Sequence, residues 1–212
     1  MIRLYIVAEG LTEFQFVVQL LKSHLEAAGK GGIDVQAPRL GGYRTWTRSK
    51  KFLRTLLQSP DPEVRVTTMI DLFKIAGDIP GRSDLPDATP LARVHQIERL
   101  IAEDVGDKRF FPYIQLHEFE ALVLSDLAVL AEQRPNRRGP ILDLKARLDK
   151  EFESPEHVNR VRPPSYWIKD VVPEYQKPTD GINAVVGIGI PKLRERCVHF
   201  GQWLDYLESL TT

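Results

Sequence analysis

The amino-acid sequence predicts an α/β fold with a four-stranded parallel sheet flanked by helices, followed by a mainly helical C-terminal extension. Short apolar runs alternate with apolar stripes at helical spacing over the first 130 residues, as in parallel sheets covered on both faces. Beyond residue 130 this alternation stops and helical stripes dominate. We therefore expect an α/β core over residues 1–130 and a helical extension over residues 131–212 that packs on the core.

Each element of the core has its own signal. Short apolar runs bounded by turn residues predict strands at residues 4–8, 33–37, 64–70 and 110–116. Helical stripes predict a helix that begins at residue 12 and further helices over residues 46–57, 91–105 and 118–129. The first stripe comprises Phe14, Val17, Val18, Leu21 and Leu25, after a capping-box spacing of Thr12 and Gln15.

The predicted extension is less regular. An amphipathic pattern predicts a helix over residues 141–152, and a stripe near residues 200–207 predicts a final helix. Residues 161–183 contain several prolines and glycines, so we expect them to be mostly irregular. In the core, the connection over residues 74–89 is long, and connections of that length are usually functional or mobile.

The composition excludes several classes of protein. The 212 residues include 29 basic and 29 acidic side chains, and this balance excludes a purely electrostatic nucleic-acid binder. One cysteine, Cys197, excludes an internal disulfide and a multi-cysteine zinc site. No apolar run approaches the ~18 residues of a membrane span, so we expect a soluble, cytoplasmic protein that does not enter a membrane.

Acidic residues stand where three predicted strands end. They are Glu9 and Glu13 after the first strand, Asp71 after the third, and Glu118 and Glu120, beside His117, after the fourth. Ligands of parallel α/β sheets bind at the carboxyl ends of the strands, so we expect these carboxylates to converge. Converging carboxylates repel one another unless a cation neutralises them, and Mg²⁺ or Mn²⁺ suits oxygen ligands. The pattern therefore predicts a metal site.

Each of these residues also has a structural interpretation. Glu13 lies in a first helical turn, where it can simply complement the helix dipole. Asp71 can cap a strand end, and one of Glu118 and Glu120 can face solvent at a helix start. His117 can be a hydrogen-bonded structural histidine. The residue pattern leaves both interpretations open.

A basic segment spans residues 39–54. It contains Arg39, Arg44, Arg48, Lys50, Lys51 and Arg54, with Tyr43 and Trp46 among them. Residues 35–60 contain no acidic side chain. Basic side chains interleaved with aromatic ones suit the backbone of DNA or RNA. A solvated helix face is the competing interpretation, and Arg134, Arg137 and Arg138 form a second, weaker basic cluster.

The segment over residues 7–13 resembles the E-G-x-T-E opening of Toprim domains, which occur in topoisomerases, primases and OLD-type (overcoming lysogenisation defect) nucleases. Residues 67–71, 80–81, 112–122 and 189–204 are similar to one bacterial family of unknown function with a Toprim-like core. The resemblance covers nearly the whole chain. It implies a four-stranded parallel core with a magnesium site, and genomic pairing with an ABC- or AAA-type ATPase in phage defence.

The resemblance also implies roles for individual acids. By position, Glu9 matches the general acid/base glutamate of Toprim domains, and Asp71 matches the first aspartate of their D-x-D pair. Glu13 matches the second glutamate that OLD-type enzymes use for metal. The chain departs from the pattern at Phe73, which replaces the second acid of D-x-D. Candidate substitutes for that acid are Glu118, Glu120 and Asp78.

We therefore expect a Mg²⁺-dependent nuclease that hydrolyses phosphodiester bonds of DNA or RNA, as the effector of an ATPase-paired phage-defence system. The expected catalytic residues are Glu9, Asp71 and Glu118, and the expected metal ligands are Glu9, Glu13, Asp71, Glu118 and Glu120. One alternative is a catalytically weak or inactive partner subunit of an ATPase, which Phe73 favours. Another is a phosphohydrolase for small phosphoesters, which would not need the basic segment. Toprim proteins often form dimers, so a homodimer is a further hypothesis.

Overall fold

The computed structural model describes residues 1–41, 45–73, 75–82, 89–160 and 162–210. They form two compact units, Met1–Leu116 with Tyr206–Thr212 and His117–Asp205. The first unit is the α/β core and the second is helical. Whereas the sequence suggested a core that ends at residue 130, the compact units divide where the last strand has ended.

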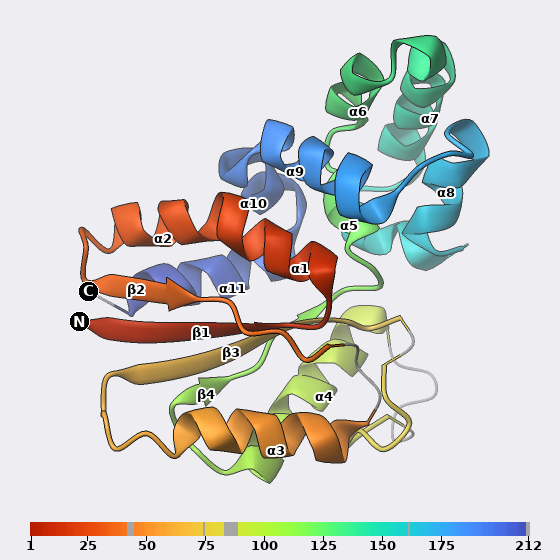
Figure 1. The fold of residues 1–212 in the computed structure, drawn as a ribbon. Helices are drawn as coiled ribbons and strands as arrows, with labels where there is room; N and C mark the ends of the chain where they lie inside the picture. Colours follow the sequence, from red (N-terminus) through yellow and green to blue (C-terminus); the bar gives the residue numbers. More distant parts are fainter. Residues whose placement is uncertain (42–44, 74, 83–88, 161, 211–212) are drawn as a thin grey trace. The chain divides into compact units, whose positions relative to one another are not determined.

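The first unit is built on a parallel sheet, as predicted (Figure 1). Its strands are β1 (Ile2–Ala8), β2 (Ile33–Gln36), β3 (Val64–Asp71), β4 (Phe110–Phe111) and β5 (Ile114–Gln115). The order is β2-β1-β3-β4, with β5 also paired to β3, and every pairing is parallel. Parallel neighbours need crossover connections, and these are supplied mainly by helices.

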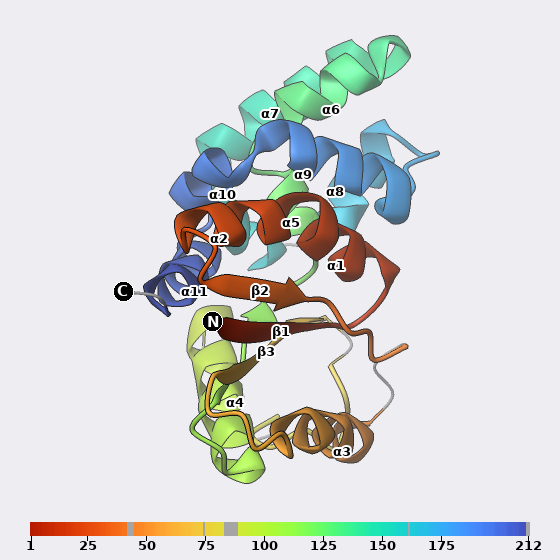
Figure 2. The ribbon, with the colours of Figure 1, turned by 60° about the vertical axis from the view of Figure 1, so that its left-hand side comes forward.

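Helices cover both faces of this sheet. On one face, α1 (Leu11–Phe16), the π-helical segment η1 (Val17–Leu21) and α2 (Lys22–Ala28) follow one another (Figure 2). The other face carries α3 (Trp46–Leu57) and α4 (Pro90–Val105). The core on the second face includes Leu53, Val66 and Ile97, each at most 1% exposed. Strands that are buried on both faces read as continuous apolar runs, which is why they were predictable.

The prediction of a single fourth strand over residues 110–116 is wrong, because these residues form β4 and β5. Pro112 between them has no N–H to donate to the ladder. A side chain bridges the break: the Thr68 hydroxyl donates to the Tyr113 carbonyl (2.9 Å) and accepts from the Tyr113 N–H (3.0 Å). Both short strands pair with β3 in one register, so the sheet edge continues across the break.

The first helix begins at Leu11, and the predicted capping box of Thr12 and Gln15 is wrong. Gly10 is the N-cap, and Glu13 Oε2 accepts the Gly10 N–H (3.0 Å). Val18 is 44% exposed although the stripe placed it inside. It lies in η1, where a π turn is wider than an α turn and departs from α spacing.

The edge strand β2 is protected by side chains of α2. The Lys22 ammonium donates to the Val35 carbonyl (2.8 Å), and the Val35 N–H donates to Glu26 Oε1 (3.5 Å). Lys22 and Glu26 also form an ion pair (2.7 Å). An edge strand presents unpaired N–H and carbonyl groups. At Val35 these groups are bonded within the chain.

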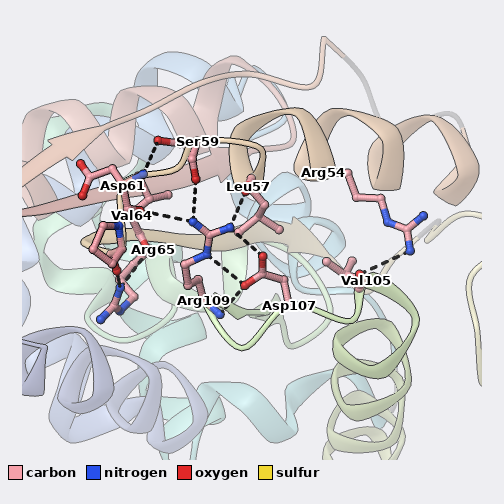
Figure 3. A network of polar contacts seen from close by, with 10 residues as sticks. Arg54, Leu57, Ser59, Asp61, Val64, Arg65, Val105, Asp107 and Arg109 are labelled. Atoms are coloured by element: carbon pink, nitrogen blue, oxygen red, sulfur yellow. Dashed lines mark hydrogen bonds and ion pairs between the residues drawn. The ribbon is translucent and has the colours of Figure 1, made fainter.

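One arginine fixes the loop that enters β3 (Figure 3). The Arg109 guanidinium donates to the carbonyls of Leu57, Ser59 (2.9 Å) and Asp61 (3.3 Å), and to the Asp107 carboxylate (2.8 Å). The same guanidinium lowers the pKa of Asp107. These bonds hold the amino end of β3 beside β4, and so fix where β3 ends at the opposite edge.

The second unit is helical. Its elements are α5 (Glu120–Val123), α6 (Leu127–Gln133), η2 (Pro135–Arg137), α7 (Arg138–Glu151), η3 (Pro155–Arg160), α8 (Pro164–Val171), η4 (Lys177–Gly181), α9 (Ile182–Ile188), α10 (Ile190–Arg196) and most of α11 (Val198–Ser209). The single helix predicted over residues 118–129 is wrong, because Asp126 Oδ1 accepts the Ala128 N–H (3.1 Å) and starts α6. Among the helices that the structure describes, none is long and apolar enough to cross a membrane.

Residues 162–183 are more ordered than predicted, since they contain α8 and η4. Two of their prolines stand in first turns, where a missing N–H costs nothing: Pro164 opens α8 and Pro178 lies in the first turn of η4. The sequence predicts breaks within a loop at these two positions, whereas both prolines begin helices. This difference matters for the site, because the segment carries several of its polar side chains.

A buried carboxylate fixes the start of α11. The N–H groups of His199 (3.0 Å) and Phe200 (3.2 Å) donate to Glu156, which is 5% exposed. Burial raises the pKa of Glu156, and the two N–H bonds oppose that rise. The Ser154 hydroxyl donates to the Arg196 carbonyl (2.9 Å) just before α11. The late segment that resembles the bacterial family therefore has a structural role.

We expect Thr68→Val to destabilise the protein by about 1–3 kcal/mol, because it leaves the buried N–H and carbonyl of Tyr113 without this partner. Valine keeps the size and branching of threonine, so the lost hydrogen bonds are the main change. Urea unfolding measures the difference. The control is Thr55→Val, whose exposed hydroxyl donates to the Lys51 carbonyl and whose effect should stay within about 0.5 kcal/mol. Equal effects of the two substitutions would contradict the bridge.

Candidate functional site

The ends of β1 and β3 meet at the carboxyl edge of the sheet. The Glu9 N–H donates to the Met69 carbonyl (3.0 Å), which extends the ladder of these strands to Glu9. The Asp71 N–H in turn donates to Glu9 Oε2 (2.9 Å). The Asp71 residue is 8% exposed. Two acids that were predicted to converge therefore lie on adjacent strands, with the carboxylate of one at the backbone of the other.

Glu13 has the structural role that the sequence left open. It is 4% exposed, and its Oε2 accepts the N–H of Gly10 at the start of α1. A Cβ at Gly10 would lie 3.2 Å from that oxygen, so glycine allows the close approach. A carboxylate has about four acceptor positions, and one N–H bond does not use them up. Capping the helix is therefore compatible with holding a cation.

In the second unit, Glu118 and Glu120 are 7% and 4% exposed, so the expectation that one of them faces solvent is wrong. Glu118 Oε2 accepts the N–H of Ser165 (3.0 Å) in the first turn of α8, where the helix dipole favours an anion. Glu120 Oε2 lies 3.8 Å from the ammonium nitrogen of Lys177. Both carboxylates are thus buried, and each is contacted by a residue from a later segment of the chain.

The segment over residues 161–183 adds polar residues to these acids that the sequence analysis missed. Asp180, 8% exposed, pairs with Arg134, and its Oδ2 accepts the Gln176 N–H (2.8 Å). Tyr175 is 3% exposed, and burial together with the nearby acids raises the pKa of its hydroxyl. The only available signal was the presence of aromatic and charged residues among the prolines. No spacing motif links them to the acids.

The contacts of His117 are those of a buried, hydrogen-bonded structural histidine. Its backbone is left-handed, with φ +68°, a conformation that bulky residues rarely adopt. The ring is buried, and Nε2 lies 3.0 Å from the Glu156 carbonyl. A carbonyl only accepts, so Nε2 carries the proton. Burial lowers the pKa of His117 to about 4, and the ring is therefore neutral near pH 7.

Part of the predicted basic segment serves to join α3 to the end of α4. The Lys50 ammonium pairs with the Asp104 carboxylate (2.6 Å) and lowers its pKa. The Arg54 guanidinium donates to the carbonyls of Asp104 (3.2 Å) and Val105 (3.4 Å), the latter drawn in Figure 3. Cations at a helix C-terminus are favoured by its dipole. These two side chains therefore stabilise the contact between α3 and α4, whether or not they also bind nucleic acid.

The rest of the basic segment is more exposed. Arg48 and Lys51 are exposed on α3. The Arg39 guanidinium lies 5.2 Å from the centre of the Phe14 ring. Arg44 lies outside the residues that the structure describes. Arg48 and Lys51 are thus the described members of the segment most suited to an external partner.

Asp78, one candidate for the missing acid of the D-x-D pair, binds the start of α3. Its carboxylate accepts the N–H groups of Trp46 (2.7 Å) and Thr47 (3.1 Å), and these bonds lower the pKa of Asp78. It is thus a cap of α3. Phe73 itself is 37% exposed. Glu118, Glu120 and Asp78 stay the predicted candidates for the missing acid.

The available donors suit a hard divalent cation. The first unit supplies carboxylates from Glu9, Glu13 and Asp71, and the second supplies Glu118 and Glu120. Carboxylate oxygens are the preferred protein ligands of Mg²⁺ and Mn²⁺. The structure brings Glu9 and Asp71 together within one unit, and Tyr175 and Asp180 join the two glutamates in the other. That all five acids form one centre stays a prediction.

Comparison with known proteins gives the family and the fold. The family model "Domain of unknown function (DUF4276)" matches residues 8–208. This chain belongs to the DUF4276 family. No curated protein matches it. Among solved structures, this DUF4276 protein is similar to the C-terminal region of the Burkholderia pseudomallei OLD protein, with a TM-score of 0.52, 14% identity, and coverage of 99% of this chain and 98% of that chain.

A second match is the C-terminal region of the Xanthomonas campestris pv. campestris OLD protein, with a TM-score of 0.44, 14% identity, and coverage of 97% of this chain and 95% of that chain. The Burkholderia match shows that this DUF4276 chain has the fold of an OLD C-terminal region. The resemblance to OLD-type proteins stated from the sequence is confirmed at the level of the fold.

We expect His117 to reduce stability as the pH falls. Its pKa is about 4 in the folded protein against an ordinary value of 6.5, so between these values only the unfolded chain takes up the proton. The free energy of unfolding of wild type minus that of His117→Asn should therefore be constant above pH 6.5 and fall by about 3 kcal/mol down to pH 4. Asparagine tolerates the left-handed backbone.

Urea unfolding in EDTA at a series of pH values measures this difference without bound metal. A difference that does not change with pH would show that the folded protein does not hold the ring neutral.

Proposed function

We propose that this DUF4276 chain is a Mg²⁺-dependent nuclease that hydrolyses phosphodiester bonds of DNA or RNA. The observation that carries the proposal is the bond from the Asp71 N–H to the Glu9 carboxylate. It joins two acids at the carboxyl edge of neighbouring parallel strands, which is where α/β sheets bind ligands. The shared fold with an OLD C-terminal region supports it, because the sequence resembles OLD-type nucleases at these same acids.

The residues divide into roles. We propose Glu9, Asp71 and Glu118 as catalytic and the same acids, with Glu13 and Glu120, as cation ligands. When bound, the divalent cation polarises the phosphoryl group and lowers the pKa of water. Glu9 accepts or donates the proton, and its Oε2 bond to the Asp71 N–H fixes the orientation of its carboxylate. Asp71 and the two glutamates of the second unit are buried, which excludes bulk water from their oxygens.

Nucleic acid is the proposed substrate because of the exposed basic residues on α3. Arg48 and Lys51 present charge to solvent and can track a phosphate backbone. The small-phosphoester alternative does not need them. We also propose, from the sequence resemblance, that the chain acts with an ABC- or AAA-type ATPase in phage defence.

A second candidate function, a weak or inactive partner subunit of such an ATPase, is favoured by one observation. Phe73 stands where Toprim domains have an acid, and the nearby Asp78 is committed to the N-terminus of α3. The first unit thus lacks one expected ligand. In this function the fold would dock to the ATPase, and copurification with an ATPase would accompany a lack of cleavage.

We expect Glu9→Gln and Asp71→Asn each to reduce cleavage in Mg²⁺ or Mn²⁺ by at least about 100-fold, because each removes a charge from the proposed site. Single-stranded and double-stranded DNA and RNA are the substrates to be assayed, with melting temperatures to confirm folding. Asp143→Asn, at an exposed position on α7, is the matched control and should cleave at the wild-type rate. Cleavage by either site variant at the wild-type rate would refute the assignment.

We expect the double substitution Arg48→Gln, Lys51→Gln to weaken binding of an oligonucleotide in EDTA. If both side chains contact phosphates of a duplex, the slope of log K against log salt concentration should fall by about 1.8, at about 0.9 per contact. Lys150→Gln with Lys169→Gln removes the same charge from exposed positions of the second unit and should leave the slope unchanged. If both pairs behave alike, Arg48 and Lys51 do not bind the oligonucleotide specifically, and the small-phosphoester function is favoured.

A further inference from the structure

The hydroxyl of Tyr175 is buried and has no hydrogen-bond partner among the described residues. The residue is 3% exposed, and the described part of the chain offers its oxygen no hydrogen bond. Buried hydroxyl groups in folded proteins are nearly always bonded, to protein or to ordered water. Its own backbone is fixed, since the Tyr175 N–H donates to the Val172 carbonyl (3.0 Å). The side chain is therefore placed by the fold, with its hydroxyl buried and open to a further hydrogen bond.

Three carboxylates lie near enough to this hydroxyl for their charges to act on it. Burial and the charges of Glu120, Asp180 and Glu118 raise the pKa of Tyr175, so the hydroxyl keeps its proton and is a donor. The carboxylates, when ionised, only accept. They are themselves held by the contacts with Ser165 and with the cations of Arg134 and Lys177. The Tyr175 hydroxyl, a donor, thus lies near carboxylates that can accept its proton but that it does not bond directly.

The packing at Gly181 shows how closely the hydroxyl is enclosed. A Cβ at Gly181 would lie 2.6 Å from the Tyr175 hydroxyl oxygen and 3.6 Å from Cε1 of Phe119. Glycine is therefore required for the hydroxyl to lie against the backbone beside Asp180. Phe119 separates the two glutamates in sequence. The hydroxyl, the glutamate segment and Asp180 consequently share one small polar region.

A water molecule fits this arrangement chemically. Water can accept the proton of one hydroxyl and donate its own two protons to two carboxylates. We infer that Tyr175 is a positioning residue for Glu118 and Glu120, acting through a buried water that accepts from its hydroxyl and donates to their carboxylates. This inference rests on the proposed function, in which the two glutamates hold a cation. Outer partners that orient ligating carboxylates typically change metal affinity 10–100-fold when removed.

The test measures Mn²⁺ binding by calorimetry for wild type, Tyr175→Phe and Glu120→Gln, at a temperature well below the lowest melting temperature of the set in EDTA. Phenylalanine removes only the hydroxyl. We expect Tyr175→Phe to raise the dissociation constant for Mn²⁺ about 10-fold. Its melting temperature in EDTA should stay at or above that of wild type. Tyr166→Phe makes the same chemical change at a 58% exposed position of α8 and should match wild type.

The outcomes separate the inference from the proposed function. Wild-type affinity in Tyr175→Phe with weakened binding in Glu120→Gln would overturn the inference and leave the proposed function standing. Wild-type affinity in both variants would overturn the inference and remove Glu120 from the metal site. No Mn²⁺ binding by the wild-type protein would overturn both. Equal losses in Tyr175→Phe and Tyr166→Phe would also overturn the inference, since the effect would not belong to the buried hydroxyl.

Discussion

The parallel pairing of β1 with β3 is the constraint on which the proposed site of the first unit depends. The register runs from Arg3 opposite Val64 to Ala8 opposite Met69, and the next residue on β1 is Glu9. β3 also pairs with β4 and β5, so it is fixed from both sides. A shift of one residue would turn every side chain of the strand to the other face. The meeting of Glu9 with Asp71 is thus a consequence of the whole sheet, including the hydroxyl bridge of Thr68 and the arginine clamp of Arg109.

Three carboxylates of the second unit follow a different rule, because each accepts an N–H group at the start of a helix. Glu118 accepts from the first turn of α8, Glu156 accepts from the first turn of α11, and Asp126 starts α6. A buried acid in such a position is stabilised by N–H groups and by the helix dipole. An acid that is needed for stability can therefore also stand in a site.

How much was predictable depended on whether the signal was local. The bounds of α3 were predicted, since its apolar spacing and its cap lie within the segment itself. The meeting of Glu9 with Asp71 followed from the general rule that parallel strands end at one edge. The break at Pro112 was missed because the group that bridges it, Thr68, is far away in the sequence.

Other features were missed for the same reason. The contacts of Lys50 and Arg54 with the end of α4 are made across the fold, and no local pattern in the basic segment marks them. Tyr175 and Asp180 meet the glutamates from a segment whose prolines suggested a loop. Proline has opposite meanings within a helix and at its start, and only the packed structure distinguishes them.

The ion pair of α2 at the sheet edge has a consequence for self-association. Exposed backbone of an edge strand is a template on which another chain can add a strand, and repeated addition leads to aggregates. At Val35, an incoming strand would first have to displace Lys22 and Glu26 from the backbone groups that they bind. Growth of the sheet across β2 by copies of this chain is thereby disfavoured. A pair of such chains that forms in the cell would have to meet through side chains rather than by extending the sheet at this strand.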